Sequence, residues 1–472
     1  MDVSRRHFLR LAGAVSLGFT GLRTAVAHGA WRGLVDDSSN AGAGFGPLVP
    51  DPAGLLDLPT GFRYQIISRM GDEMTDGLLV PGQPDGMAAF PSPDGKTVLI
   101  CNHEIEADWV AKGPFGPNNE RLARVPRDMF YDFGNGSRPC IAGTTRLIYD
   151  TRTRRMENQH LSLIGTIYNC AGGPTPWNSW LTCEETTQRG DAPYEKNHGY
   201  VFEVPALVSG LSPARPIKEM GRYRHEAVAI DPRTGVVYLT EDRDDGLIYR
   251  FLPKNPRDLY AGGRLQMLVV RERRGLDTRN WPGEDALPTR NPVPVGRPLA
   301  TDWIDCEEID APDDDLRARG WCSGAARFAR GEGMWFGRGC VFFACTTGGD
   351  KRCGQIWKYT PSPDEGTPAE SAKPGVLELF IEPNDPGLIE NADNVTVAPW
   401  GDLIICEDGP SESKQFLVGA TPNGELYKLA RNAKDGSEFA GATFAPDGTT
   451  LFVNLQETGV TLAIDGPWRK PA

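Results

Sequence analysis

Acidic side chains recur beside short apolar segments throughout this chain of 472 residues. They belong to six copies of one pattern: an apolar segment, a turn rich in Pro, Asp and Gly, a second apolar segment, then polar residues. The copies occupy residues 85–104, 169–185, 225–242, 331–348, 393–408 and 441–457. Clustered carboxylates repel one another, and a folded protein keeps many of them together when cations neutralise their charge. The repeat therefore predicts a metal site where the fold brings its copies together.

One candidate ring of ligands comes from the second residue of each copy. Aligned in this way, the copies contribute Gly86, Cys170, Glu226, Glu332, Asn394 and Ala442. Carboxylate and amide oxygens suit Ca²⁺ or Mg²⁺, whereas a thiolate suits softer or redox metals such as iron. We therefore predict that Cys170, Glu226, Glu332 and Asn394 bind a cluster with more than one kind of metal.

A second candidate ring follows the apolar segment after each turn. Its members are Asn102, Glu184, Glu241, Thr346, Glu407 and Asn454, and the acids beside it are Glu104, Glu185, Asp242 and Asp408. As an alternative, these acids could end their strands in solvent. The recurrence of an acid after the apolar segment in four of the copies favours metal binding. The additional ligands that we predict are Glu104, Glu184, Glu241, Asp242 and Glu407.

Basic residues stand next to these acids. Arg330 precedes Gly331 and Glu332, so its guanidinium is close to a proposed ligand. Arginine recognises phosphate through paired hydrogen bonds, and the alternative is a salt bridge that holds Glu332 in place. His103 and His225 could be metal ligands or hydrogen-bond partners.

The elements that must position these residues are short strands. Each copy of the pattern is typical of a β-hairpin. Six hairpins, separated by one or two further strands each, predict an all-β, six-bladed β-propeller with the metal site in its central channel. Residues 60–69 are expected to close the ring against residues 460–464. A pair of β-sandwiches is the alternative, but it does not explain the repeat.

The N-terminus carries an export signal. Residues 4–10 read SRRHFLR, an apolar run covers 11–22, and Ala25-Val26-Ala27 resembles a cleavage site. We predict a twin-arginine signal peptide at 1–27, a linker at 28–58 and the propeller domain at 59–472, with an insertion at 253–300. The apolar run is too short to span a bilayer. We therefore expect export by the twin-arginine machinery to the periplasm or the medium, with no membrane span in the mature form.

Composition limits the partners. The formal net charge of −13 argues against binding to nucleic acid, whose phosphates an acidic surface repels. An acidic protein is instead suited to collecting hard cations. There are ten cysteines, and their pairing cannot be deduced from the sequence. We expect a monomer that acts on a small molecule.

At these motifs the sequence resembles the PhoX family of secreted alkaline phosphatases, which the twin-arginine pathway exports. The resemblance covers roughly residues 59–468, and several motifs together make it specific. The matching motifs, besides the signal, are Asn102-His103-Glu104, Asn169-Cys170-Ala171-Gly172-Gly173, Cys183-Glu184-Glu185, His225-Glu226-Ala227, Thr240-Glu241-Asp242, Arg330-Gly331-Glu332-Gly333, Asp393-Asn394 and Cys406-Glu407-Asp408.

The resemblance implies a propeller that holds an iron–calcium cluster, with Ca²⁺ alone as the simpler possibility. It implies that Cys170 supplies the thiolate ligand of iron, that Glu226 and Glu332 supply carboxylate ligands, and that Arg330 binds the phosphate. The implied reaction is hydrolysis of a phosphomonoester by a metal-bound oxo or hydroxide nucleophile. Cys170, Glu332 and Arg330 would be the catalytic residues.

Two other functions fit parts of the sequence. A calcium-dependent lactonase or esterase could use the same scaffold, although Cys170 and Arg330 speak against it. A non-catalytic module could use calcium only to rigidify a propeller that binds a partner. The chain is also shorter than the larger PhoX phosphatases, so its substrate could differ from theirs.

Overall fold

Strands make up nearly all the regular structure of this protein. The computed structural model describes residues 43–136, 138–282 and 291–470. Within these ranges there is one α-helix, α3 (Leu316–Cys322), together with short 3₁₀ turns. The predicted signal peptide, 1–27, lies outside the described residues, and so does the linker as far as residue 42. None of the helices described is both long enough and apolar enough to cross a membrane.

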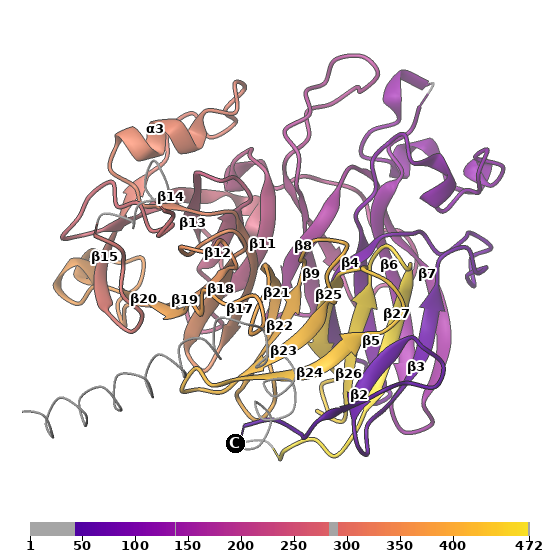
Figure 1. Cartoon of the computed structure of the whole chain (residues 1–472). Coiled ribbons are helices and arrows are strands. Elements are labelled where there is room, and N and C mark those ends of the chain that lie inside the picture. Colours follow the sequence, from indigo (N-terminus) through magenta and orange to yellow (C-terminus); the bar gives the residue numbers. More distant parts are fainter. Residues whose placement is uncertain (1–42, 137, 283–290, 471–472) are drawn as a thin grey trace, which may run out of the picture.

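The strands form five hydrogen-bonded sheets, most of whose neighbours are antiparallel hairpin partners (Figure 1). One four-stranded sheet contains β4 (Pro84–Pro91), β5 (Thr97–His103), β6 (Ala142–Asp150) and β7 (Arg155–Thr166). A three-stranded sheet contains β8 (Asn169–Pro174), β9 (Ser179–Glu184) and β10 (Val201–Pro205). The second four-stranded sheet contains β25 (Phe439–Phe444), β26 (Thr450–Leu455), β27 (Val460–Asp465) and β3 (Arg63–Arg69).

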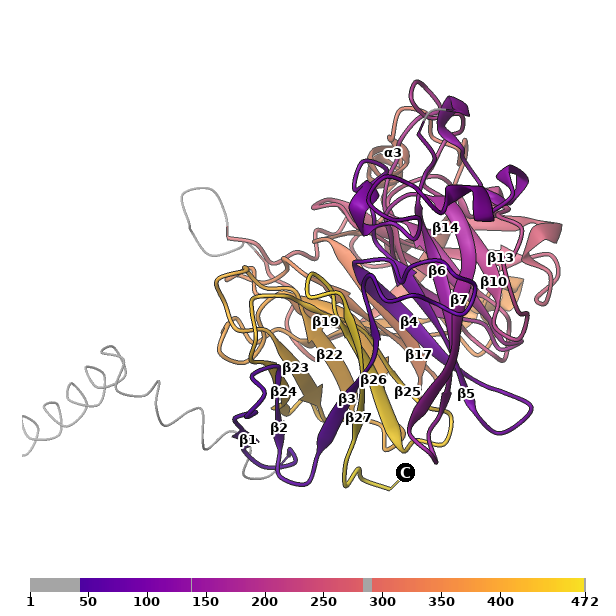
Figure 2. The same ribbon diagram turned by 90° about the vertical axis from the view of Figure 1, so that its right-hand side faces the viewer.

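The two remaining sheets are larger. The six-stranded sheet contains β21 (Ala392–Val397), β22 (Leu403–Glu407), β23 (Phe416–Ala420), β24 (Leu426–Asn432), β2 (Leu56–Pro59) and β1 (Leu48–Val49). Both β1 and β2 come from the segment preceding residue 60, and β2 pairs with β24 (Figure 2). The ten-stranded sheet contains β11 (His225–Ile230), β12 (Val237–Glu241), β13 (Gly246–Pro253), β14 (Gly263–Val270), β15 (Pro298–Asp305), β16 (Arg327–Phe328), β17 (Gly331–Gly337), β18 (Cys340–Cys345), β19 (Gln355–Thr360) and β20 (Val376–Ile381).

The ten-stranded sheet overturns the predicted six-bladed propeller. Strand β15 pairs with β14 along one edge and with β20 along the other, so two sets of hairpins merge into one sheet. The end strands of this sheet, β11 and β17, also contact each other, which makes it nearly closed, like a barrel. The other four sheets form a propeller-like ring with it. The prediction failed because the repeat determines the hairpins but does not determine which outer strands form hydrogen bonds with each other.

The segment predicted as an insertion, 253–300, supplies β14 and the first residues of β15. The predicted closure of the ring by residues 60–69 is present, because β3 pairs antiparallel with β27 near the C-terminus. This pairing brings residues 63–69 and residues 460–465 together in one sheet.

The first strands of the repeats pack against one another around the middle of the molecule. Contacts join β4 to β8, β8 to β11, β17 to β21 and β25 to β4. Glycines permit this close approach: a Cβ on Gly86 would lie 2.5 Å from the Cα of Ala171, and one on Gly333 would lie 2.5 Å from the Cα of Asn394. The apolar core lies between neighbouring sheets. Trp180 and Phe202, for example, pack against Phe90 and Val98 of the adjacent sheet.

Candidate metal centre

The first strand of every repeat has the same irregularity. Its antiparallel pairing with the second strand skips two residues near its start, as in a β-bulge. A bulge leaves its residues out of the ladder and changes the direction of their side chains. The first skipped residue of each strand, in chain order, is Asp85, Cys170, Glu226, Glu332, Asp393 and Gly441. Five of these six positions carry a potential metal ligand.

The bulges correct the alignment of the first predicted ring. In that ring Gly86, Asn394 and Ala442 stood beside Cys170, Glu226 and Glu332. The structure shows that these three are the second bulge residues, one position too late. The equivalent residues are Asp85, Asp393 and Gly441, so the ring contains two more carboxylates than the sequence alignment suggested.

Main-chain carbonyls of the bulges are held by side chains from the neighbouring repeat. Asn102 Nδ2 donates to the carbonyl of Cys170 over 2.9 Å. Thr240 Oγ1 donates to the carbonyl of Glu332 over 2.8 Å, and Asn454 Nδ2 donates to that of Asp85 over 2.6 Å. All three donors occupy the same place, one residue before the end of the second strand. These three hydrogen bonds fix the bulges of neighbouring repeats relative to one another.

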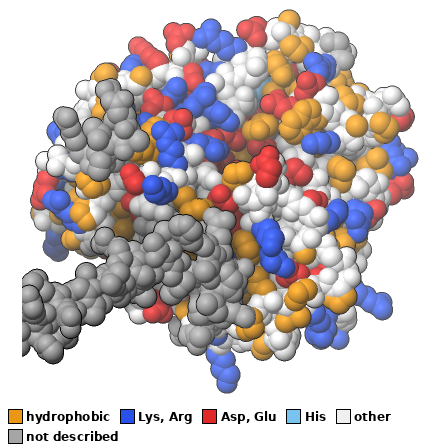
Figure 3. Space-filling model, in the orientation of Figure 1, with side chains coloured by type: hydrophobic (Ala, Val, Ile, Leu, Met, Phe, Trp, Pro, Cys, Tyr) orange, Lys and Arg blue, Asp and Glu red, His pale blue; other side chains and the backbone are white. Residues whose placement is uncertain are grey.

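Five of the six first skipped residues, all but Gly441, line one pocket of about 280 Å³. Ten carboxyl groups and two guanidinium groups line it, together with Cys170. The carboxyl groups belong to Asp85, Glu104, Glu185, Glu226, Asp242, Glu332, Asp393, Asp408, Glu438 and Glu457. In the space-filling view, acidic side chains show in the middle of the face, with Lys and Arg side chains nearby (Figure 3).

Burial and crowding perturb these carboxyl groups. Burial, reinforced by the charge of Asp393, raises the pKa of Asp85 to about 8. Burial and the charge of Asp408 raise the pKa of Asp393 to about 7. Burial and neighbouring carboxylates raise the pKa of Glu226 and of Glu332 well above the usual value. So many acids in one buried pocket are stable in ionised form only with a positive charge among them.

The residues present fit metal ions in three places, two of which overlap. Ligand atoms lie within 4.8 Å of one another in the groups Cys170–Glu185–Glu226, Asp85–Glu104–Glu438 and Glu226–Glu332–Asp393. Glu226 belongs to two groups, so ions bound there would share it. Asp85 Oδ1 is buried and has no hydrogen-bond partner among the described residues. An unsatisfied buried carboxylate oxygen suits a cation ligand.

Two arginines face the acids across the pocket. Arg330 donates to Asp242 through Nε (2.8 Å) and Nη2 (3.2 Å), and its Nη2 also donates to Glu332 over 2.7 Å. Arg224 occupies the same place in the preceding repeat, two residues before Glu226. It bonds Glu185 and lies 3.8 Å from the carboxylate of Asp242. Both guanidiniums therefore meet at Asp242.

Strained backbone aims three side chains at this pocket. Gln83, Tyr168 and Arg330 each come just before a bulged strand and have φ of 47°, 55° and 53°. This left-handed region is unfavourable for residues with a Cβ and is retained where the surroundings enforce it. All three side chains line the pocket. Three of the non-glycine residues with positive φ are therefore pocket residues, while the others lie elsewhere in the described chain.

Comparison with known proteins identifies the family. The family model described as alkaline phosphatase PhoX matches residues 43–132 and 135–459, which is most of the chain. The chain belongs to the PhoX family of alkaline phosphatases. It is a metal-dependent phosphatase that hydrolyses phosphomonoesters.

Three solved structures are similar to this PhoX-family chain, and the first of them shares its fold. Pseudomonas fluorescens PhoX in complex with vanadate, a transition state analogue, superposes with a TM-score of 0.63 at 19% identity, covering 88% of this chain and 96% of that chain. A gluconolactonase of Xanthomonas campestris, XC5397, has a TM-score of 0.36 at 11% identity and covers 89% and 98% of the two chains. A putative 6-phosphogluconolactonase of Bacteroides uniformis has a TM-score of 0.35 at 12% identity, with 79% of each chain covered. None of the curated proteins matches the chain.

Six of the predicted site residues meet in the pocket of this PhoX-family chain. They are Glu104, Cys170, Glu226, Asp242, Arg330 and Glu332. Asn394 does not line it: its Oδ1 accepts from the backbone N–H of Gly441 over 2.7 Å. His103 bonds the carbonyl of Gly82 and Thr145, and His225 bonds the carbonyl of Gly221. The two histidines therefore act as hydrogen-bond partners in the structure.

Three predicted ligands lie behind the pocket instead of in it. Glu184 accepts from the backbone N–H groups of Gly199 and Tyr200, and Glu407 accepts from that of Phe416. Glu241 accepts from the backbone N–H of Leu247 over 3.2 Å. Each carboxylate thus caps the backbone just before or at the start of the next strand in its sheet. These three acids stabilise their own sheets through hydrogen bonds with the backbone.

The sequence reasoning left several pocket residues out of its ligand set: Asp85, Glu185, Arg224, Asp393, Asp408 and Glu438. The signal for Glu185 and Asp408 was a doubled acid, of the same kind as the pair that contains the predicted ligand Asp242. In Glu184-Glu185, Glu241-Asp242 and Glu407-Asp408, the first acid ends the strand and the second lies beyond it. Adjacent strand residues face opposite sides, so only the second acid of each pair reaches the pocket.

Proposed function

We propose that the acid-lined pocket is where this PhoX-family phosphatase binds and hydrolyses its phosphomonoester. The observation that carries the proposal is the convergence of the bulge residues Cys170, Glu226 and Glu332 with Arg330 around one buried space. Ten carboxyl groups alone would repel a phosphate dianion, so the pocket can accept one only when cations are bound.

We propose Ca²⁺ and iron as those cations. Carboxylate oxygens such as those of Asp85, Glu104 and Glu438 are the ligands that Ca²⁺ prefers. The thiol of Cys170, beside Glu185 and Glu226, is better suited to iron than to calcium. Burial raises the pKa of this thiol well above its usual value, so it becomes a thiolate only with a metal bound. Bound cations supply Lewis acidity, which stabilises the charge that develops on phosphoryl oxygens.

Arg330 is the proposed phosphate ligand. It already holds two carboxylates, and a guanidinium offers five N–H donors in a plane. Its bidentate contact with Asp242 fixes the plane of the guanidinium and leaves other N–H groups for phosphoryl oxygens. Arg330 therefore orients the phosphate and stabilises negative charge in the transition state.

We further propose that the protein is exported through the twin-arginine pathway and works as a monomer in the periplasm or outside the cell. Residues 4–10 and 25–27 support the export signal. Export in a folded state would allow the metal ligands, which come from every part of the chain, to assemble before translocation.

The test is release of p-nitrophenol from p-nitrophenyl phosphate at alkaline pH by the metal-replete enzyme. A calcium chelator should abolish the release, and Cys170→Ala should lower kcat strongly without loss of the fold. Full activity in Cys170→Ala, or in the presence of chelator, would overturn the proposed site.

A further inference from the structure

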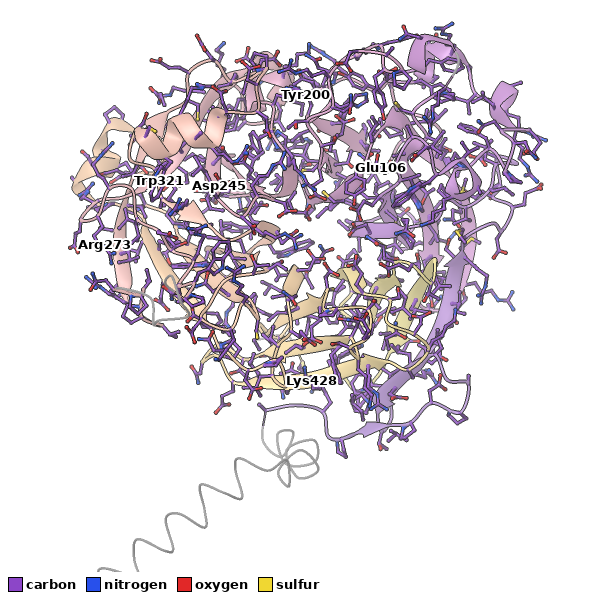
Figure 4. The ribbon with its side chains drawn as sticks, turned by 45° about the horizontal axis from the view of Figure 1, so that its top comes forward. Glu106, Tyr200, Asp245, Arg273, Trp321 and Lys428 are labelled. Atoms are coloured by element: carbon purple, nitrogen blue, oxygen red, sulfur yellow. The ribbon has the colours of Figure 1, made fainter. Side chains whose placement is uncertain are left out.

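A second cavity, of about 500 Å³, adjoins the acid-lined pocket. Tyr168, Glu185 and Arg224 line both spaces. Figure 4 shows Glu106, which also lines the second cavity, near the middle of the molecule, whereas Trp321 and Arg273 lie at the periphery. A molecule whose phosphate occupies the first pocket therefore has room in the second for the group attached to it.

The second cavity is polar on nearly every side. Its wall is formed largely by the segment 186–191, which follows the acid pair at the end of β9, and it includes Thr186, Thr187 and Gln188. Tyr168 is the sole aromatic lining residue, and no Leu, Ile, Val, Met or Phe lines it within the described part of the chain. A flat hydrocarbon ring would gain little from burial there, and it would remove water from polar groups without replacing their hydrogen bonds.

The arginines of the second cavity are already paired. Arg189 lies 2.7 Å from Asp313, and Arg243 lies 2.7 Å from Asp314. Arg224 pairs with Glu185. Since each of the three guanidiniums has a carboxylate partner, a second anionic group on the substrate would have to displace one. The cavity is therefore better suited to an uncharged group than to an anionic one.

Hydrogen-bonding capacity remains available in the wall. The Nε–H of Arg243 is buried and has no hydrogen-bond partner among the described residues. Gln188 uses its amide nitrogen in bonds of 3.2 Å to the carbonyl of Arg189 and 3.4 Å to Asp191. The amide oxygen of Gln188 accepts no hydrogen bond from the parts of the chain that are described. The buried donor of Arg243 and the acceptor of the half-buried Gln188 favour a ligand that carries hydroxyl groups.

We propose that the second cavity binds the alcohol part of the phosphomonoester and selects hydroxylated alcohols, such as sugars or polyols, over flat aromatic alcohols. This inference rests on the proposed function, because it needs the phosphate in the acid-lined pocket. Thr187 and Gln188 are its specificity-determining residues, since their side chains can exchange hydrogen bonds with hydroxyl groups.

The experiment compares kcat/KM for glucose 6-phosphate and for phenyl phosphate. The wild-type enzyme should prefer the sugar phosphate, and the double variant Thr187→Val/Gln188→Met should lower that preference about tenfold, because it removes hydrogen bonds that only the sugar can use. The control is Thr449→Val, in a separate cavity that also contains Arg152 and Asp447. It should leave the preference unchanged, and melting temperatures would verify that both variants fold.

The outcomes separate this inference from the proposed function. An enzyme that hydrolyses phenyl phosphate as well as or better than the sugar phosphate, with a ratio that the double variant does not change, is still a phosphatase but overturns the subsite. A metal-replete enzyme that hydrolyses neither ester overturns the proposed function and the subsite with it.

Discussion

The side-chain amide of Asn454 donates a 2.6 Å hydrogen bond to the main-chain carbonyl of Asp85, 369 residues earlier in the chain. This bond links the last repeat to the first, and the same bond recurs from Asn102 to Cys170 and from Thr240 to Glu332. The side chains that line the pocket are therefore positioned by residues that do not enter it.

Replacing Asn454 tests this positioning. We expect Asn454→Ala to cost about 1 to 2 kcal/mol of unfolding free energy, because a buried bond is lost. We also expect roughly a tenfold loss of kcat, because the Asp85 bulge is released. Urea unfolding and steady-state kinetics measure the two effects. Activity equal to that of the wild type at a temperature where the variant is folded would show that the bulge does not need the bond.

The acids that line the pocket and the acids that lie behind it should respond differently to neutralisation of their charge. Glu332→Gln should lower kcat by about 100-fold or more, because a ligand in the pocket is lost. In metal-free protein it should leave the melting temperature close to that of the metal-free wild type. Glu407→Gln should lower the melting temperature instead, because the Glu407 carboxylate holds Lys428 and backbone N–H groups. The reverse pattern would place Glu407 in the metal centre.

Metal removal should destabilise the fold as well as stop the reaction. The pocket gathers acids from most of the sheets, so bound cations hold these sheets together. We expect Ca²⁺ at about 100 times its dissociation constant to add roughly 3 kcal/mol to the unfolding free energy of chelated protein. Differential scanning calorimetry with and without Ca²⁺ measures the effect. An unchanged transition temperature would mean that the described acids do not bind the ion.

His198 predicts a pH dependence that is separate from the metal centre. Its Nδ1 lies 2.6 Å from Glu184 and its Nε2 lies 3.3 Å from Asp132, all three being buried. Although burial opposes it, the charge of Glu184 and the bond with Asp132 raise the pKa of His198 well above its usual value. A raised pKa means that the folded state binds the proton more tightly than the unfolded state. The resulting stability is complete below about pH 6.5 and is lost as the pH rises through the folded value.

We therefore expect His198→Gln to cost about 3 kcal/mol of unfolding free energy near pH 6, since removing one partner leaves buried carboxylates unpaired. The difference between wild type and variant should shrink only at alkaline pH. Unfolding titrations in urea between pH 6 and pH 10 would measure it. A difference that is the same at every pH would show that His198 is neutral in the folded protein.

The sequence predicted the all-β class and the hairpins, because local apolar runs and turns encode them. It also predicted the closure of β3 on β27, because a ring of repeats brings its first and last strands together. It did not predict the ten-stranded sheet, since the pairing of β15 with β14 and β20 depends on outer edges that carry no repeat. Register was the other limit. The bulges shift the alignment by one residue, so Asp85 and Asp393 were replaced in the predicted ring by Gly86 and Asn394.

The choice between adjacent acids could not be made from the sequence either. Glu184 and Glu185 have almost the same chemistry, and only the end of β9 decides which one faces the pocket. A shift of one residue exchanges the two sides of a strand. Cys170, Glu226 and Glu332 were found because the copies that contain them happened to be aligned in the correct register.

The central claim is that metal ions held by the bulge residues bind phosphate beside Arg330. A crystal structure of the active, metal-replete enzyme with bound phosphate, with diffraction measured on both sides of the iron absorption edge, tests it most directly. We predict an anomalous iron signal next to the sulfur of Cys170, further cations among Asp85, Glu104 and Glu438, and phosphate oxygens on the guanidinium of Arg330. An active enzyme whose crystals show phosphate bound elsewhere, or no metal among these residues, would contradict the account.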